Sequence, residues 1–329
     1  MMTVFRRWRH RRSDDELVVL AGSASPGLTE QICSELGIAV GRGETLRFGE
    51  GTLFVRILDN VRGRSVYVVQ STGAPVNDNF MELVFWIDAA KRASAASVTA
   101  VVPYLGYSKG DKKDEPRVSI RVRVCADALE AAGVDRVVTM DLHAPQIQGF
   151  FRVPVDDLYA RPRLCAAIAQ LPLSDPVVVA PDAGFAKRAR RYALQLGFPL
   201  AIADKARPDH SGRVELLELI GDVEGKDAVI VDDVVLGGST LVEAAGALRE
   251  RGARSIWAAV THPVLSDGAL ERIEASPIER LVVTDTVDPP RASAKLQTVA
   301  IAPLFAEAIR RIDRRESISV LFEEPPSSA

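Results

Sequence analysis

Cysteine and long apolar runs are both scarce in this sequence. Its 329 residues include three cysteines, Cys33, Cys125 and Cys165, which are widely spaced and form no CxxC pair. Such a set argues against a disulfide framework or a zinc site and predicts reduced thiols in a cytoplasm. The first apolar run, LVVLAG from Leu17, is too short for a signal-peptide core or a membrane span. We therefore expect a cytoplasmic protein with no membrane partner.

Net charge is also nearly absent. The formal net charge is only −3, so the sequence as a whole offers no field that would attract nucleic acid or an anionic membrane. We expect neither of them as a partner. Residues 1–16 are a local exception, because they begin with a cluster of arginines. This stretch predicts a disordered basic arm.

The length of the chain predicts two domains. Single hydrophobic cores stop growing at roughly 250 to 300 residues, and this chain is longer. Apolar residues make up 47% and charged residues 26%, which is typical of a soluble globular enzyme. A break at residues 159–164, followed by Pro172 and Pro176, is where we expect the domain boundary.

Short apolar runs alternate with amphipathic helical patterns, of which residues 77–93 are the clearest. Eight such runs begin at Leu17, Val66, Val98, Arg136, Pro176, Asp227, Ser255 and Leu281. Continuous apolar strands separated by helices predict an α/β chain with parallel sheets covered on both faces. In such sheets, ligands bind beyond the carboxyl ends of the strands.

The stretch VIVDDVVLGGST ends one of these runs. Asp232 and Asp233 are expected at the strand end, and residues 237–240 (Gly-Gly-Ser-Thr) precede a helical pattern. Glycines before a helix let backbone N–H groups converge on an anion, which predicts a phosphate loop. The acids would repel that phosphate, so they are expected to accept hydrogen bonds from sugar hydroxyls or to hold water on a metal.

Two more strand ends carry metal-binding side chains. His143 follows the run at Arg136, and Asp182 follows the run at Pro176. A single imidazole can bind a divalent ion while phosphate oxygens complete its coordination, although a lone histidine is also often structural.

Cationic side chains stand in two loops. Lys109 belongs to a charged stretch, residues 107–120, that can close as a lid over a polyphosphate or remain a solvated loop. Lys205 and Arg207 are two residues apart on an extended segment, so both can face one anion, although a solvated loop is the alternative.

Together these segments resemble the ribose-phosphate diphosphokinase family, the phosphoribosyl-diphosphate synthetases. The similarity runs from residue 17 to residue 322 and includes QSTGAPVNDNFMEL at Gln70, TMDLHAPQIQGFFRVPVD at Thr139 and VTHPVLS at Val260. It implies two phosphoribosyltransferase-like domains, each a mostly parallel sheet flanked by helices. These would span residues 17–160 and 161–303, with residues 304–322 packing back on the first.

The resemblance also implies an activity. The family transfers a diphosphoryl group from Mg-ATP to the 1-hydroxyl of ribose 5-phosphate, giving 5-phosphoribosyl 1-diphosphate and AMP. The partners implied are ATP, ribose 5-phosphate, the cofactor Mg²⁺ and further copies of the chain in a dimer-based hexamer.

Site residues carry over position by position. Lys205 and Arg207 would act on the transferring group. Ribose phosphate would be bound by Asp232, Asp233, Gly237, Gly238, Ser239 and Thr240. ATP would be bound by Phe48, Glu50, Lys109, Asp111 and His143, and metal by His143 and Asp182. Arg62, Ser317 and Ser319 match parts of a regulatory phosphate or ADP site.

Several positions depart from the family pattern. Leu236 stands where the phosphate loop usually has an acid, and Phe185 replaces a glycine near Asp182. Lys109 replaces an arginine, and Thr52 replaces a glutamate. Three readings follow: an active diphosphokinase whose acceptor or nucleotide preference has changed, a weakly active regulatory or scaffold subunit, or another transferase or nucleotide sensor on this fold.

Overall fold

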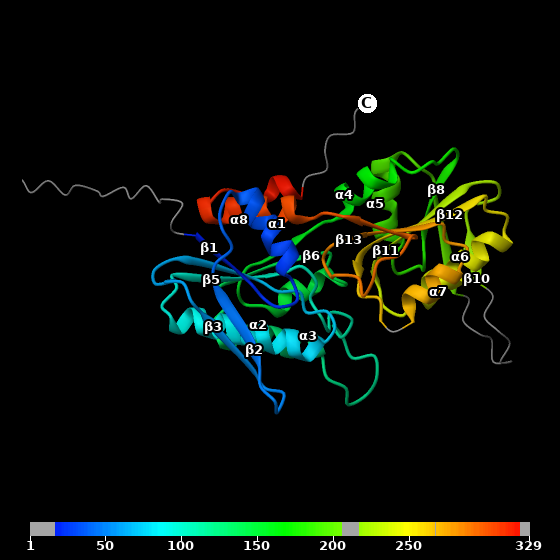
Figure 1. Cartoon of the computed structure of the whole chain (residues 1–329). Coiled ribbons are helices and arrows are strands. Elements are labelled where there is room, and N and C mark those ends of the chain that lie inside the picture. The colour runs from blue at the N-terminus through cyan, green and yellow to red at the C-terminus, as the bar shows by residue number, and fades with distance from the viewer. Residues whose placement is uncertain (1–16, 206–216, 267, 323–329) are drawn as a thin grey trace, which may run out of the picture.

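The first half of the chain forms a parallel sheet with one projecting ribbon (Figure 1). The computed structural model describes residues 17–205, 217–266 and 268–322, so the basic arm predicted over residues 1–16 lies outside it. The elements of this half are β1 (Leu17–Ala21), α1 (Pro26–Leu36), β2 (Gly43–Arg47), β3 (Leu53–Ile57), β4 (Ser65–Val69), α2 (Val76–Arg92), β5 (Ser97–Val102), α3 (Arg121–Ala132), β6 (Arg136–Met140), the 3-10 helix η2 (Pro145–Phe150) and β7 (Val155–Leu158).

The second half forms a larger sheet. Its elements are α4 (Arg161–Ile168), β8 (Pro176–Ala180), α5 (Ala186–Leu196), β9 (Leu200–Lys205), β10 (Leu217–Ile220), β11 (Asp227–Val235), α6 (Ser239–Glu250), β12 (Ser255–Pro263), α7 (Ala269–Ala275), β13 (Arg280–Thr284), β14 (Leu296–Val299), α8 (Ala302–Arg314) and η3 (Ser319–Leu321).

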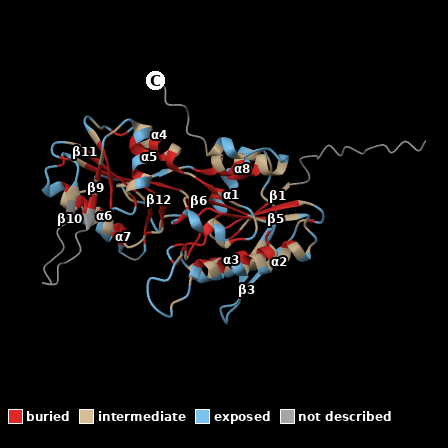
Figure 2. Cartoon of the chain, turned by 180° about the vertical axis from the view of Figure 1, so that it is seen from behind, coloured by how far each residue is buried: buried red, intermediate tan, exposed pale blue. Residues whose placement is uncertain are grey.

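The predicted α/β architecture is confirmed. All eight apolar runs form strands, namely β1, β4, β5, β6, β8, β11, β12 and β13. The sheet order is β1-β4-β5-β6-β7 in the first half and β10-β9-β8-β11-β12-β13-β14 in the second. Within these two sheets only β10 runs antiparallel to its neighbour, and β2 and β3 form a separate antiparallel ribbon. Figure 2 shows that the strands of both sheets are largely buried beneath helices with exposed outer faces.

The two sheets repeat one unit in the same register. Leu17 of β1 lies opposite Ser65 of β4, and Pro176 of β8 lies opposite Asp227 of β11. The strand order β8-β11-β12-β13-β14 of the second sheet also corresponds to the order β1-β4-β5-β6-β7 of the first. The loops repeat as well, because an aspartate directly after β6 accepts from the amide of Ala160, and one directly after β13 accepts from that of Ile301. The fold thus contains a structural duplication that no fixed residue period in the sequence reveals.

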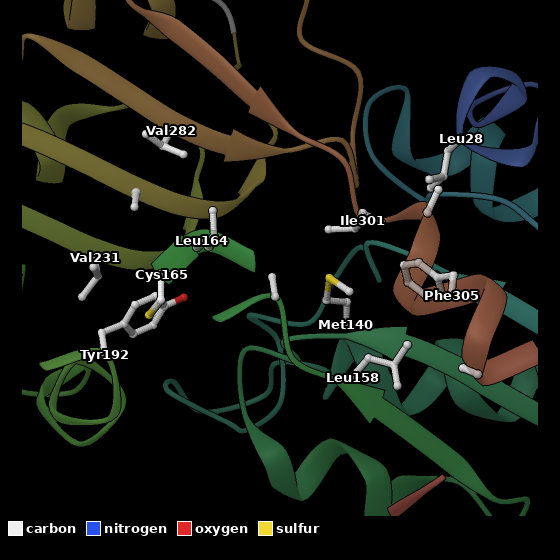
Figure 3. Packing of buried hydrophobic residues seen from close by; sticks show 14 of the residues in the cluster. Leu28, Met140, Leu158, Leu164, Cys165, Tyr192, Val231, Val282, Ile301 and Phe305 are labelled. Carbon is white, nitrogen blue, oxygen red and sulfur yellow. The ribbon is translucent and has the colours of Figure 1, made fainter. Parts of the chain in front are cut away.

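One apolar core joins the two halves. It includes Met140 and Leu158 from the first sheet, Val231 and Val282 from the second, and Phe305 from α8 (Figure 3). Continuous packing of this kind resists small displacements. The loops of both sheets are therefore anchored to the same core.

The return of the C-terminal segment is visible in the contacts of α8. Arg310 on α8 donates to the carbonyl of Glu35 on α1 at 2.8 Å. The first sheet ends with β7 and the second begins at β8. The domain boundary near residue 160 stays a prediction. It is supported by the fact that the chain passes from the first sheet to the second between β7 and β8. None of the described helices is both long and apolar enough to cross a bilayer.

Candidate active site

A cavity of about 510 Å³ lies where the loops of the two halves meet. It is at the carboxyl ends of β8 and β11, the place where open α/β sheets bind ligands. Of the residues predicted for the site, its walls contain Lys109, His143, Asp182, Asp232, Asp233, Gly237, Gly238, Ser239 and Thr240. Tertiary structure thus brings together side chains that are more than 130 residues apart in the sequence.

The glycine loop leads directly into α6. Gly238 has a φ of +76°, a left-handed conformation that favours glycine, and α6 begins at Ser239. Arg272 donates to the carbonyl of Gly237 at 2.8 Å and thereby fixes the loop. The first backbone N–H groups of a helix have no partner within it, and they carry partial positive charge. The arrangement therefore suits a phosphate group.

The paired acids lie inside the strand and not at its end as predicted, because β11 continues to Val235. Asp233 accepts from His143 Nδ1 at 2.7 Å and from Arg188 Nη1 at 3.4 Å, and its side chain is only 7% exposed. Burial raises the pKa of Asp233, but the His143 hydrogen bond and the positive charges outweigh it and hold the pKa below its ordinary value. Burial and the Asp233 charge raise the pKa of Asp232 well above its ordinary value.

The segment that carries His143 is fixed by two aspartates, the buried Asp157 and the half-buried Asp141. The backbone N–H of Leu142 donates to Asp157 at 3.0 Å, and Thr261 of the second half donates to Asp141 at 2.7 Å. Burial raises the pKa of Asp157 to about 7 and also raises that of Asp141. These bonds hold the segment against both sheets, so the position of His143 depends on their relative placement.

His143 and Asp182 offer a sparse set of metal ligands. The carboxylate of Asp182 is exposed and accepts the backbone N–H of Phe185 at 2.8 Å. His143 uses Nδ1 for Asp233, which leaves Nε2 for the cavity, and a carboxylate partner orients a ligating histidine in this way. The described residues contain no group of three or more His, Cys, Asp or Glu able to hold a metal ion. The pair fits Mg²⁺, which often binds through one or two protein ligands plus substrate phosphates.

The structure leaves the predicted catalytic pair undescribed and places two of the predicted ATP-binding residues away from the cavity. Lys205 ends β9, but its side chain is not described, and Arg207 lies outside the described residues. Phe48 and Glu50 occupy the turn of the β2–β3 ribbon, whose tip points away from the second sheet (Figure 1). Phe48 is 47% exposed, and Glu50 accepts from Thr52 at 2.6 Å. Neither lines the cavity.

Asp111 and the predicted regulatory residues also lie apart from the cavity walls. Asp111 accepts from Gln146 at 2.9 Å. Arg62 donates to the hydroxyl of Ser94 at 3.1 Å, and the hydroxyls of Ser317 and Ser319 are 3.1 Å apart. Within the described ranges, no hydrogen bond or ion pair joins Arg62 to either serine.

Sequence reasoning missed Arg188. This side chain lies on α5, lines the cavity and contacts Asp233. The segment AKRARRYALQL gives no local signal, because several cations on one helix are typical of a solvated face. Phe185 and Leu236, two of the departures from the family pattern, also line the cavity.

Comparisons with known proteins cover nearly the whole chain. Residues 17–133 match the family described as the N-terminal domain of ribose phosphate pyrophosphokinase, and residues 208–323 match the phosphoribosyl synthetase-associated domain. A ribose-phosphate pyrophosphokinase of Burkholderia pseudomallei is 47% identical over 95% of this chain and 99% of its own length. One of Caldanaerobacter subterraneus subsp. tengcongensis is 48% identical over 94% of this chain and 99% of its own.

A solved structure agrees with these relatives. The crystal structure of phosphoribosylpyrophosphate synthetase from Mycobacterium smegmatis has a TM-score of 0.86 and 39% identity, covering 91% of this chain and 99% of its own. The similarity spans both halves of the fold and therefore includes the elements that build the cavity. The chain belongs to the ribose-phosphate pyrophosphokinase family.

Proposed function

We propose that this protein transfers a diphosphoryl group from Mg-ATP to the 1-hydroxyl of ribose 5-phosphate, forming 5-phosphoribosyl 1-diphosphate and AMP. One observation carries the proposal: a single cavity joins a paired-acid strand and a glycine loop from the second half to His143 and Lys109 from the first. Relatives 47% identical over 95% and 93% of this chain bear the name of this activity.

The second half would bind the acceptor sugar. The loop at residues 237–240 would hold the 5-phosphate through backbone N–H groups at the start of α6. Asp232 and Asp233 would accept hydrogen bonds from the ribose hydroxyls, because carboxylates are acceptors for such groups. The sugar would then be fixed at both ends, which directs its 1-hydroxyl toward the first half of the cavity.

The opposite wall would bind the triphosphate. His143 and Asp182 would hold magnesium together with phosphate oxygens, and the ion when bound would neutralise charge on the transferring group. Lys109, Lys205 and Arg207 would add positive charge. Transfer of this kind needs positioning and charge neutralisation more than covalent help, so we propose no nucleophile from the protein.

We further propose that the active form is a homo-oligomer. Phe48 and Glu50 lie in the turn between β2 and β3 and do not line the cavity of their own chain, so they would contact ATP in a neighbouring copy. The exposed ring of Phe48 is suited to stacking on a base, because stacking requires an open aromatic face. Regulation through Arg62, Ser317 and Ser319 would likewise require surfaces of several copies.

A changed acceptor preference remains a second candidate. Leu236 and Phe185 make part of the cavity wall apolar, and they are the positions at which the sequence departs from the acid and the glycine of the family pattern. The missing carboxylate removes one acceptor for a sugar hydroxyl, and the phenyl ring occupies space beside Asp182. A different pentose phosphate would then be the better acceptor.

The direct test is product formation by the purified full chain. Mg-ATP is offered with ribose 5-phosphate and a panel of other pentose phosphates, and AMP and the diphosphorylated sugar are measured by ³¹P NMR. Thr240→Val should raise KM for ribose 5-phosphate about fivefold with KM for ATP unchanged, since a neutral hydrogen bond contributes about 1 kcal/mol. The matched control is Thr298→Val at an exposed position of β14. Absence of AMP with every sugar, while ATP still binds, would refute the proposal and favour a regulatory or scaffold subunit.

A further inference from the structure

Arg188 lies where three segments of the site meet. Its side chain is 27% exposed and extends from the first turn of α5 toward the loop after β6. One guanidinium nitrogen donates to the carbonyls of Leu142 and His143 at 2.5 and 3.0 Å. The other terminal nitrogen donates to the carboxylate of Asp233 at 3.4 Å. A single side chain thus joins α5, the His143 segment and β11.

The shape of the guanidinium matters for these contacts. Its planar fork presents several donors in fixed directions, which a lysine ammonium cannot reproduce. The group also lies 5.8 Å from the centre of the Phe185 ring, within the range in which a cation is attracted to an aromatic face. Phe185 therefore adds a contact to those that Arg188 makes with the two carbonyls and Asp233.

The duplicated fold shows that the repeated unit does not itself require an arginine at this point. In the first half, α1 follows β1 as α5 follows β8. The corresponding turn of α1 carries Leu28 and Thr29, both buried and uncharged, and Thr29 donates only to the carbonyl of Ser25. The arginine occurs only in the copy whose cavity contains paired acids and faces a histidine.

We propose that Arg188 is a positioning residue that fixes His143 and Asp233 relative to each other across the cavity. The group that would bind the metal and phosphates is then kept at a fixed position relative to the group that would bind the sugar. This inference rests on the proposed function and deepens it. Misplacing a reacting group by about 1 Å can cost roughly 10²-fold in rate, which sets the size of the expected effect.

Kinetics of three variants test the proposal on the full chain. Arg188→Met should lower kcat about 100-fold while KM for ribose 5-phosphate and ATP changes less than threefold. Arg188→Lys should lose at least tenfold in kcat, since its ammonium cannot make the fork of contacts. Arg190→Met, on the exposed face of the same helix, should have a kcat within twofold of the parent chain. Added guanidinium ion should raise the kcat of Arg188→Met at least fivefold.

A second measurement is independent of activity. The ¹⁵N NMR signals of the His143 ring, assigned with His143→Gln, report its hydrogen bond to Asp233. They should change in Arg188→Met and Arg188→Lys but not in Arg190→Met. If the parent chain makes no sugar diphosphate, the proposed function fails while this readout still decides the role of Arg188.

Three results would overturn the proposal. One is unchanged His143 signals in a folded Arg188 variant. Another is a kcat within threefold of the parent for Arg188→Lys. The third is a large rise in KM without loss of kcat, which would instead indicate direct contact of Arg188 with substrate. Arg188→Lys retains the charge and stem, so it keeps the test decisive if Arg188→Met does not fold.

Discussion

Replacing Asp233 by asparagine should reduce kcat/KM for ribose 5-phosphate by about 10³-fold. Two effects of the substitution combine. A hydrogen bond from a sugar hydroxyl to a charged group contributes about 1.5–3 kcal/mol, or at least a factor of about ten. Asp233 also orients His143 through the 2.7 Å bond, and loss of such a partner typically costs about 10- to 100-fold.

The assay is the initial rate of AMP formation as a function of ribose 5-phosphate at saturating Mg-ATP. Thermal unfolding of the same preparation verifies that the variant is folded. Asp222→Asn, a matched change at an exposed carboxylate outside the cavity, should leave kcat/KM unchanged within twofold. A fall of less than tenfold in folded Asp233→Asn would show that this carboxylate neither binds the sugar nor orients His143.

Three further predictions concern stability and the reaction. Asp227 accepts from the side chain of Arg254 and from the backbone amide of Ser174, and these bonds, chiefly that of Arg254, hold its pKa below the ordinary value. Its stabilising effect is therefore present above about pH 4, the usual carboxyl pKa, and is lost as pH falls further. Asp227→Asn should lower Tm by about 4 °C at pH 7, for a loss of about 2 kcal/mol in the free energy of unfolding. Scanning calorimetry should find a smaller Tm difference between the parent and the variant at pH 3. An equal Tm difference at the two pH values would contradict this prediction. Leu236→Asp supplies a hydrogen-bond acceptor for a sugar hydroxyl and should lower KM for ribose 5-phosphate at least threefold. An unchanged KM would show that Leu236 does not determine which sugar phosphate is used. Lys205→Ala should abolish turnover while calorimetry shows ribose 5-phosphate still binding, and an unchanged rate would exclude Lys205 from the reaction.

The strands predicted from sequence are those buried on both faces. Burial on both faces requires continuous apolar runs, and all eight such runs form strands. Of the strands that were not predicted, β7, β10 and β14 lie at sheet edges and β2 and β3 form the ribbon, where only one face needs to be apolar, whereas β9 lies between β8 and β10. The residues of β3, for example, alternate between half-buried and exposed, and β10 pairs only with β9. Such short segments give a weaker apolar signal than strands buried on both faces.

Local sequence alone determined which loops carry the chemistry of the site. Glycines before a helix, acids near the end of a buried run and a histidine after another are short-range patterns, and strand direction places them at the same edge of a sheet. His143, Asp182, Asp233 and the loop at residues 237–240 all line the cavity as a result.

Only the tertiary structure decided how these groups hold one another. The Asp233 carboxylate meets an imidazole 90 residues away, and the Arg188 guanidinium meets carbonyls 45 and 46 residues away. Nothing in a basic helix identifies which arginine enters the site. That choice is made when two sheets with matching register pack on one apolar core and bring α5 against the His143 segment. Partners fixed by packing between distant segments leave no local pattern, because the sequence encodes them only through the fold.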